Sequence, residues 1–162
     1  MSVSPDQRWI YFESGIHRNI WKVSSEGGEE IPISDETVYQ SALSPDGKLM
    51  AYFSRIKDGD NRYRIAVMSL ETGKVVKTFA LADDKSTPVV ITWATAGRGF
   101  DYVIQAGSSA LWRQSLDQDH PRFMADLGSE DYNDFALSPD GNFVGFIRGR
   151  WILGAVLVEG LK

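Results

Sequence analysis

Few side chains in this 162-residue chain have the types and spacing that acid–base or metal chemistry requires. Asp58-Gly59-Asp60-Asn61 most resembles a calcium loop. An EF-hand loop needs Gly at its sixth position and Glu at its twelfth. Counted from Asp58, those positions hold Tyr63 and Ser69. We therefore interpret the segment as a solvated hairpin turn.

A second polar group is formed by Asp117, Asp119 and His120. The other histidine, His17, lies 103 residues earlier in the chain, and no Gly-x-Ser-x-Gly nucleophile elbow accompanies the group. The sequence contains no cysteine, which excludes disulfides, thiol catalysis and cysteine-based zinc sites. We interpret the group as a surface turn, and we expect no catalytic residue, no metal site and no cofactor.

Three acidic loops are better candidates, for binding rather than for catalysis. Two lie at residues 34–38 and 82–87, and the third is the stretch that contains Asp126, Glu130, Asp131 and Asp134; each leads into an apolar segment. Their carboxylates predict a negative surface that attracts a basic peptide or a cation; the alternative is that they are ordinary solvated loops. The residues that we expect to contact a partner are Asp35, Glu36, Tyr39, Asp83, Asp84, Asp131, Tyr132, Asn133 and Asp134.

A repeated sequence motif indicates the turns and strands that position these loops. Ser-Pro-Asp followed by an apolar run begins at residues 4, 44 and 138, and a decayed copy occupies residues 91–97. Proline and Asp favour a tight turn at these points. A second motif keeps the same period, because the strand-like segments 20–24, 65–69 and 111–115 lie 45 and 46 residues apart. Two motifs with one period indicate a repeat protein.

Each repeat reads as four short strands, which in the best-preserved unit are expected at 39–43, 48–54, 63–70 and 75–81. Four antiparallel strands per repeat of about 40–50 residues are typical of a β-propeller blade, whereas a β-sandwich would not require the same turn in every unit. We expect an all-β propeller segment of about four blades, at residues 1–34, 35–82, 83–127 and 128–162. Trp21 and Trp112 occupy equivalent third-strand positions, which predicts packing between blades.

Blade order places the three acidic loops at one mouth of the central channel, because each precedes an innermost strand. Tyr39 and Trp93 are the candidate apolar anchors there, with core packing the simpler interpretation of Trp93. The sequence pattern gives the first blade only the end of its innermost strand. It gives the last blade no outer strand. We expect a fragment of a longer propeller, or a chain that forms a homo-oligomer through its open blade edges.

The composition excludes several classes of function. A net charge of −5 disfavours a nucleic-acid-binding protein, which needs a basic face. The longest apolar run, residues 151–158, is far shorter than the ~20 residues that span a bilayer. We expect neither nucleic-acid binding nor membrane insertion.

The Ser-Pro-Asp-Gly turns and the strand Asn19-Ile20-Trp21-Lys22-Val23 resemble the WD-like repeats of TolB-like propellers over nearly the whole chain. The resemblance is strongest to the C-terminal propellers of bacterial Ser/Thr kinases and winged-helix regulators. It implies a sensory or docking module that binds a protein or peptide at the channel mouth and relays binding to an output domain. It also favours an extracytoplasmic location. The accessory propeller of a prolyl-oligopeptidase-type hydrolase and a structural oligomerisation scaffold are the alternatives.

Overall fold

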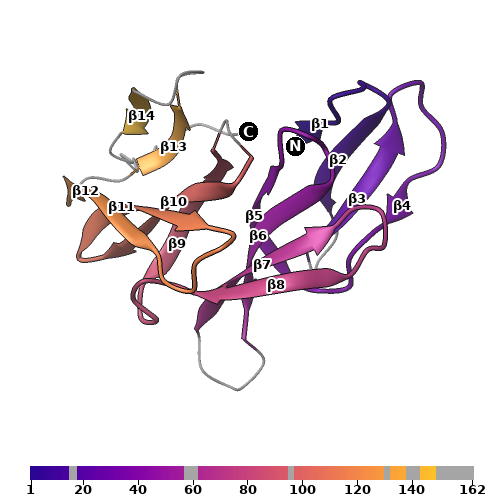
Figure 1. Ribbon diagram of the computed structural model, residues 1–162. Helices are drawn as coiled ribbons and strands as arrows, with labels where there is room; N and C mark the ends of the chain where they lie inside the picture. The colour runs from indigo at the N-terminus through magenta and orange to yellow at the C-terminus, as the bar shows by residue number, and fades with distance from the viewer. Residues whose placement is uncertain (15–17, 57–61, 95–96, 130–131, 138–142, 149–162) are drawn as a thin grey trace, which may run out of the picture.

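The computed structural model (Figure 1) describes residues 1–14, 18–56, 62–94, 97–129, 132–137 and 143–148. Every regular element in these ranges is a β-strand. None of the described residues forms a helix with the length and apolar character needed to cross a bilayer.

The strands form four antiparallel sheets, which we call blades 1 to 4. Blade 1 contains β1 (Ser2–Val3), β2 (Trp9–Ser14), β3 (Asn19–Ser24) and β4 (Ile31–Pro32). Blade 2 contains β5 (Val38–Leu43), β6 (Leu49–Arg55), β7 (Tyr63–Ser69) and β8 (Val75–Ala80). Blade 3 contains β9 (Thr87–Trp93), β10 (Gly99–Ala106), β11 (Ser108–Ser115) and β12 (Arg122–Gly128). Blade 4 contains β13 (Tyr132–Leu137) and β14 (Val144–Arg148).

The predicted four-strand repeat is confirmed. In blades 1 to 3 the strands pair in chain order, and the four strands expected in the best-preserved unit are β5 to β8 to within one residue at each end. The third unit forms a complete blade although its Ser-Pro-Asp phrase has decayed. The apolar run at 151–158 lies outside the described residues.

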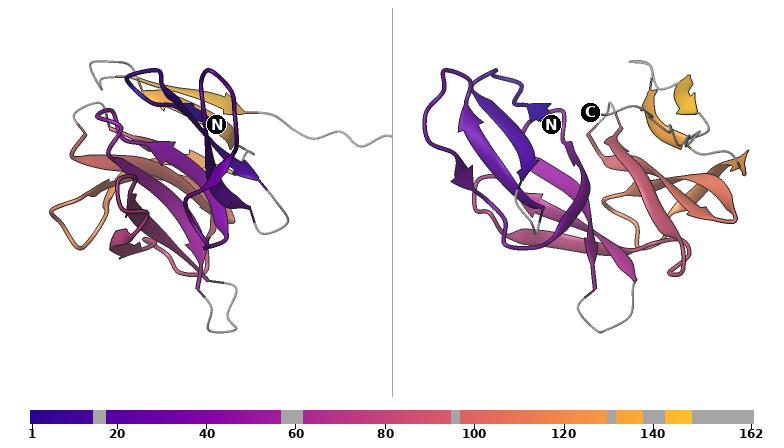
Figure 2. Two further views of the ribbon diagram at one scale, coloured as in Figure 1. Left: turned by 90° about the vertical axis from the view of Figure 1, so that its right-hand side faces the viewer. Right: turned by 180° about the vertical axis from the view of Figure 1, so that it is seen from behind.

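The blades stand side by side around a common axis, as Figures 1 and 2 show. The first strands of successive blades are neighbours, with β1 beside β5, β5 beside β9 and β9 beside β13. This arrangement is that of a β-propeller, in which the first strand of each blade lies closest to the axis.

Successive blades are held together by the alternation of side chains along their strands. In β6, Tyr52 packs toward blade 1 and its neighbour Phe53 packs toward blade 3, and both side chains are fully buried. On the other side of the interface between blades 2 and 3, Phe100 and Tyr102 are also fully buried. The Phe53 and Tyr102 rings meet edge to face with centroids 6.2 Å apart. Aromatic side chains thus fill the space between the two sheets.

The Ser-Pro-Asp motif forms a turn between the first and second strands of a blade, and side-chain hydrogen bonds stabilise this turn. In blade 2, the Ser44 hydroxyl donates to Asp46 Oδ1 (2.7 Å) and accepts from the Leu49 amide (2.9 Å), while the Lys48 amide donates to Asp46 Oδ1 (3.1 Å). Ser4 and Asp6 make the same bonds in blade 1. In blade 3, Ala94 lacks the hydroxyl, yet its backbone bonds to Gly97 and Gly99 are retained. The backbone turn therefore survives the loss of its side-chain bonds.

The turns of neighbouring blades also stack. Gly47 has a φ of +70°, and a Cβ at this position would lie 2.6 Å from Cδ of Pro5 in the preceding turn. Gly97 has nearly the same φ of +69°, but its nearest neighbour, Cδ of Pro45, would lie 4.0 Å away. Glycine at 47 is thus required both by the backbone conformation and by the contact with blade 1.

This pair of glycines provides a matched test. Gly97→Ala should lower the free energy of unfolding by about 1 kcal/mol, the cost of a side chain in the left-handed region. Gly47→Ala should cost at least about 1 kcal/mol more, because its Cβ must displace Pro5. Denaturant unfolding measures both values. Equal losses would show that the stacking of blade 1 on this turn contributes little.

The same turn predicts a pH dependence. The hydrogen bond from Ser44, together with that from the Lys48 amide, lowers the pKa of Asp46 below its ordinary value of 3.8. The ionised Asp46 carboxylate therefore stabilises the fold above about pH 3.8, and this stabilisation is lost as the pH falls through the pKa of Asp46 in the folded protein. Asp46→Asn should lose less stability between pH 5 and pH 2 than the wild type in urea unfolding. Parallel pH profiles for the two proteins would contradict this.

Candidate ligand-binding site

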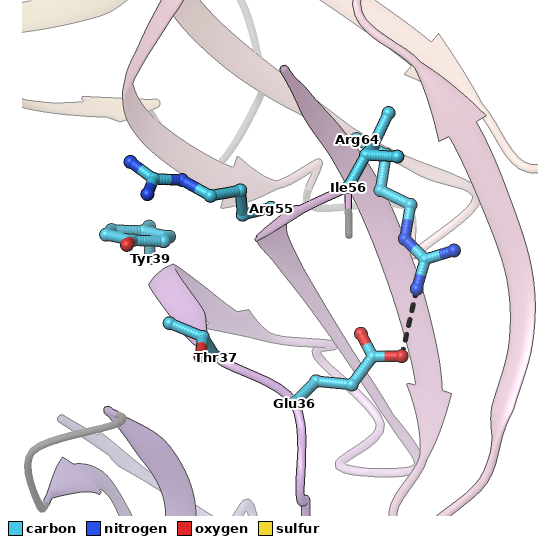
Figure 3. Close-up of a pocket in the computed structure, with 6 residues that line it drawn as sticks. All are labelled: Glu36, Thr37, Tyr39, Arg55, Ile56 and Arg64. Carbon is cyan, nitrogen blue, oxygen red and sulfur yellow. Dashed lines mark hydrogen bonds and ion pairs between the residues drawn. The ribbon is translucent and has the colours of Figure 1, made fainter. Parts of the chain in front are cut away.

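The ends of three blade 2 strands surround a pocket, whose lining residues are shown in Figure 3. It lies on the face opposite the Ser-Pro-Asp turns. The turn after β5 defines one end of the blade, so the start of β5, the end of β6 and the start of β7 share the other end. The pocket has a volume of about 420 Å³, within the range of small ligand sites. It is lined by Glu36, Thr37, Tyr39, Arg55, Ile56 and Arg64.

The half-buried ring of Tyr39 lies among cationic and aromatic groups. The guanidinium carbons of Arg18 and Arg55 lie 5.3 Å and 5.9 Å from its ring centroid. Tyr63 meets it edge to face at 5.3 Å and also has Arg55 over its own ring at 5.7 Å. Cations within about 6 Å of an aromatic ring are attracted by its electron density. We call Arg18, Tyr39, Arg55 and Tyr63 the Tyr39 cluster. Its members hold one another in place through these contacts.

Backbone strain flanks Tyr39. The pairing of β5 with β6 slips between Tyr39 and Ser41, and the intervening Gln40 has a φ of 49°. Arg18 has a φ of 51°, and its carbonyl accepts a hydrogen bond from the Val38 amide at 3.1 Å. A bulge of this kind re-aims the side chains beside it, and non-glycine residues in this region tend to occur at functional sites.

Glu36 is fixed within the pocket by two neighbours. Arg64 Nη2 lies 2.9 Å from Glu36 Oε1, and Arg64 Nε donates to the Ser54 hydroxyl at 3.0 Å. The hydroxyl of the fully buried Tyr52 approaches Glu36 Oε2 at 3.4 Å. Burial, aided by the Glu36 charge, raises the pKa of Tyr52 well above its usual value. Tyr52 therefore stays protonated and donates to Glu36 at all ordinary pH values.

Arg55 differs from the other arginines around the pocket. Arg18 pairs with Glu13 at 2.8 Å, and Arg62 lies 3.9 Å from Asp84. In the described part of the chain, the one hydrogen bond found for the Arg55 side chain is a long one, 3.4 Å from Nη2 to the Tyr63 hydroxyl, and no carboxylate there forms an ion pair with Arg55. Figure 3 shows Arg55 reaching over Tyr39, while Arg64 reaches Glu36 on the other side of the pocket.

The residues predicted to contact a partner separate into groups. Glu36 and Tyr39 come together in the pocket, and Asp84 lies beside Arg62 at the same end of the blade. Asp83 instead accepts from the Lys85 amide and the Ser86 hydroxyl within its own loop, and Asp35 is exposed. Asp131 lies outside the described residues; Tyr132, Asn133 and Asp134 lie on β13, and their side chains are not among those described. Contact of these nine residues with a partner stays a prediction.

Sequence reasoning missed the arginines and Tyr63. Arg55 pairs with Tyr63, and Ser54 with Arg64, across the β6–β7 hairpin. The predicted strands 48–54 and 63–70 implied a hairpin, but no register was derived for it and Arg55 lay outside the first strand. The predicted contact residues were acidic residues together with Tyr39, Tyr132 and Asn133. With the arginines present, the carboxylates at this end of blade 2 are largely compensated, so a simple negative surface does not describe it.

The other polar groups that the sequence analysis considered can be located in the described part of the chain. Within the described ranges, no three His, Cys, Asp or Glu residues are placed to hold a metal ion. Asp117, Asp119 and His120 are exposed in the turn between β11 and β12, as predicted. The buried carboxylate of Asp101 is bound by both Nε and Nη2 of Arg113 at 2.7 Å. Trp93 is a core residue, whose Nε1 donates to the Ala42 carbonyl at 2.7 Å.

The two predicted inter-blade tryptophans differ in their surroundings. Trp112 packs against the core between blades 2 and 3, which confirms that prediction. Trp21 alternates with Ile20, which packs toward blade 2. Trp21 therefore lies half-buried on the opposite face of blade 1.

Strain at Gln40 is testable. Gln40→Gly should raise the free energy of unfolding by up to about 1 kcal/mol, because glycine adopts positive φ without the clash that Gln suffers. Gln7 has a φ of 60° in the blade 1 turn, distant from the pocket, so Gln7→Gly is the matched control and should give a similar gain. Denaturant unfolding measures both. A loss for Gln40→Gly alone would show that the Gln40 side chain, not the backbone, determines stability there.

No protein-family model matches the chain. A curated relative, the uncharacterized protein Atu1656 of Agrobacterium fabrum, is 30% identical over 109 residues, which are 62% of this chain and 37% of that protein. The chain thus spans well under half of that relative's length.

Two solved structures share the arrangement of strands. A structure assigned as TolB from Agrobacterium tumefaciens superposes with a TM-score of 0.76 at 20% identity, covering 91% of this chain and 52% of that one. TolB from Acinetobacter baumannii gives a TM-score of 0.70 at 20% identity, covering 89% of this chain and 36% of that one. The chain therefore matches part of each of these propellers, and its fold is that of a TolB-like β-propeller.

Proposed function

We propose that this propeller segment is a non-catalytic binding module, and that it holds a peptide or a protein segment at the Tyr39 cluster. The observation that carries the proposal is the pocket of about 420 Å³ in which Tyr39, Arg55 and Glu36 converge from β5, β6 and the preceding loop. Polar groups that converge beside apolar surface, which Tyr39 and Ile56 supply here, are a feature of ligand sites.

The chemistry of the lining residues favours binding over catalysis. Glu36 Oε1 pairs with Arg64 and Oε2 is approached by the Tyr52 hydroxyl, so both carboxylate oxygens already have a partner. The remaining lining groups are a threonine, a tyrosine, an isoleucine and two arginines, which contain no paired nucleophile and base. Aromatic and arginine side chains are instead the residues that most often dominate binding energy at protein interfaces.

The frame behind the site is rigid, which suits recognition. Tyr39 and Tyr63 pack against the buried cluster between blades 2 and 3. Residues held in place before a ligand arrives lose less conformational entropy when it binds. A site at strand ends beside a packed core therefore supports a docking role.

Selection from a random peptide display library tests the proposal. Peptides enriched on the wild-type chain should lose at least about tenfold in affinity for Tyr39→Ala, as expected for an aromatic hot spot. Phe123→Ala removes a half-exposed aromatic side chain from β12 and is the matched control, which should leave affinity unchanged. Peptides that bind Tyr39→Ala as tightly as the wild type would refute binding at this cluster.

A further inference from the structure

We propose that the segment bound at the Tyr39 cluster is acidic, and that Arg55 binds one of its carboxylates. This inference rests on the proposed function and adds the chemistry of the ligand. It begins from the charge pairing around the pocket: Arg18, Arg62 and Arg64 each have a carboxylate within 4 Å, whereas no such partner of Arg55 is found in the described ranges.

The Arg55 guanidinium is held ready for such a group. The rings of Tyr39 and Tyr63 lie 5.9 Å and 5.7 Å from its central carbon, and the long bond to the Tyr63 hydroxyl involves only Nη2. A guanidinium presents several donors in a planar fork that matches the two oxygens of a carboxylate. Contact with the two rings is compatible with this fork, because the one hydrogen bond found for the group in the described ranges uses only Nη2 and leaves its other donors for a ligand.

A basic ligand fits the pocket less well. Its cation would need Glu36, but Arg64 already occupies Oε1 of that carboxylate and Tyr52 approaches Oε2. A lysine or arginine of a partner would therefore have to displace an existing ion pair. A carboxylate at Arg55 displaces nothing that the structure describes.

The overall charge limits the acidic segment to a short one. A chain of net charge −5 repels a long run of carboxylates. Ile56 and the Tyr39 ring supply apolar surface beside Arg55 in the same pocket. The ligand that fits is one Asp or Glu next to an apolar residue.

The peptide selection described above provides the probes. Enriched peptides should contain Asp or Glu beside an apolar residue. A synthetic peptide in which that acid is replaced by its amide should bind the wild-type chain about tenfold more weakly, as expected for loss of a charged hydrogen bond. For Arg55→Gln, the acidic peptide and its amide analogue should bind equally. Arg55→Lys, which keeps the charge but not the fork, should retain part of the difference.

The outcomes separate the two proposals. Peptides that depend on Tyr39 but lack an acidic residue, or that bind equally as acid and amide, would overturn the role of Arg55 and leave the binding function standing. Failure to select any Tyr39-dependent peptide would overturn both. Because Arg55 is exposed, thermal unfolding of Arg55→Gln should match the wild type; affinity lost together with fold stability would also count against the inference.

Discussion

The contact between blades 2 and 3 is the interaction on which the other features depend. Phe53 of β6 and Phe100 and Tyr102 of β10 are fully buried there, and burying such side chains supplies the largest favourable term in folding. Sheets of four strands cannot cover both of their apolar faces alone. Each blade is therefore stable only against its neighbours, as in other repeat proteins.

The candidate site at the end of blade 2 borders this same interface through Tyr39 and Tyr63. Tyr39 and Tyr63 pack against the buried cluster and also lie within 6 Å of the Arg55 guanidinium carbon. The core thus fixes the aromatic rings, and the rings in turn hold the guanidinium. This continuity explains how a group as flexible as Arg55 is kept over an open pocket.

The fold could be predicted from the sequence because each repeat shows the same turn and strand signals, so the loss of one signal in one repeat does not hide the pattern. Ser44 and Asp46 lock a turn that recurs at Ser4 and Asp6, and the pattern was strong enough to locate the third blade after Ala94 replaced the serine. The site was only partly predictable. Glu36 and Tyr39 were named, but the bulge at Gln40 and the cross-strand approach of Arg55 to Tyr63 depend on tertiary geometry, which no periodicity encodes.

Native-state hydrogen exchange tests the central claim, that blades 2 and 3 form one cooperative unit holding the site. The account predicts that the slowest amides of β6 and β10 exchange with the same opening free energy and the same dependence on denaturant, because each sheet needs the other to bury its face. If the β10 amides opened at a much lower free energy than those of β6, blade 2 would be stable without its neighbour. The interface could then not be what holds Tyr39 and Arg55 in place.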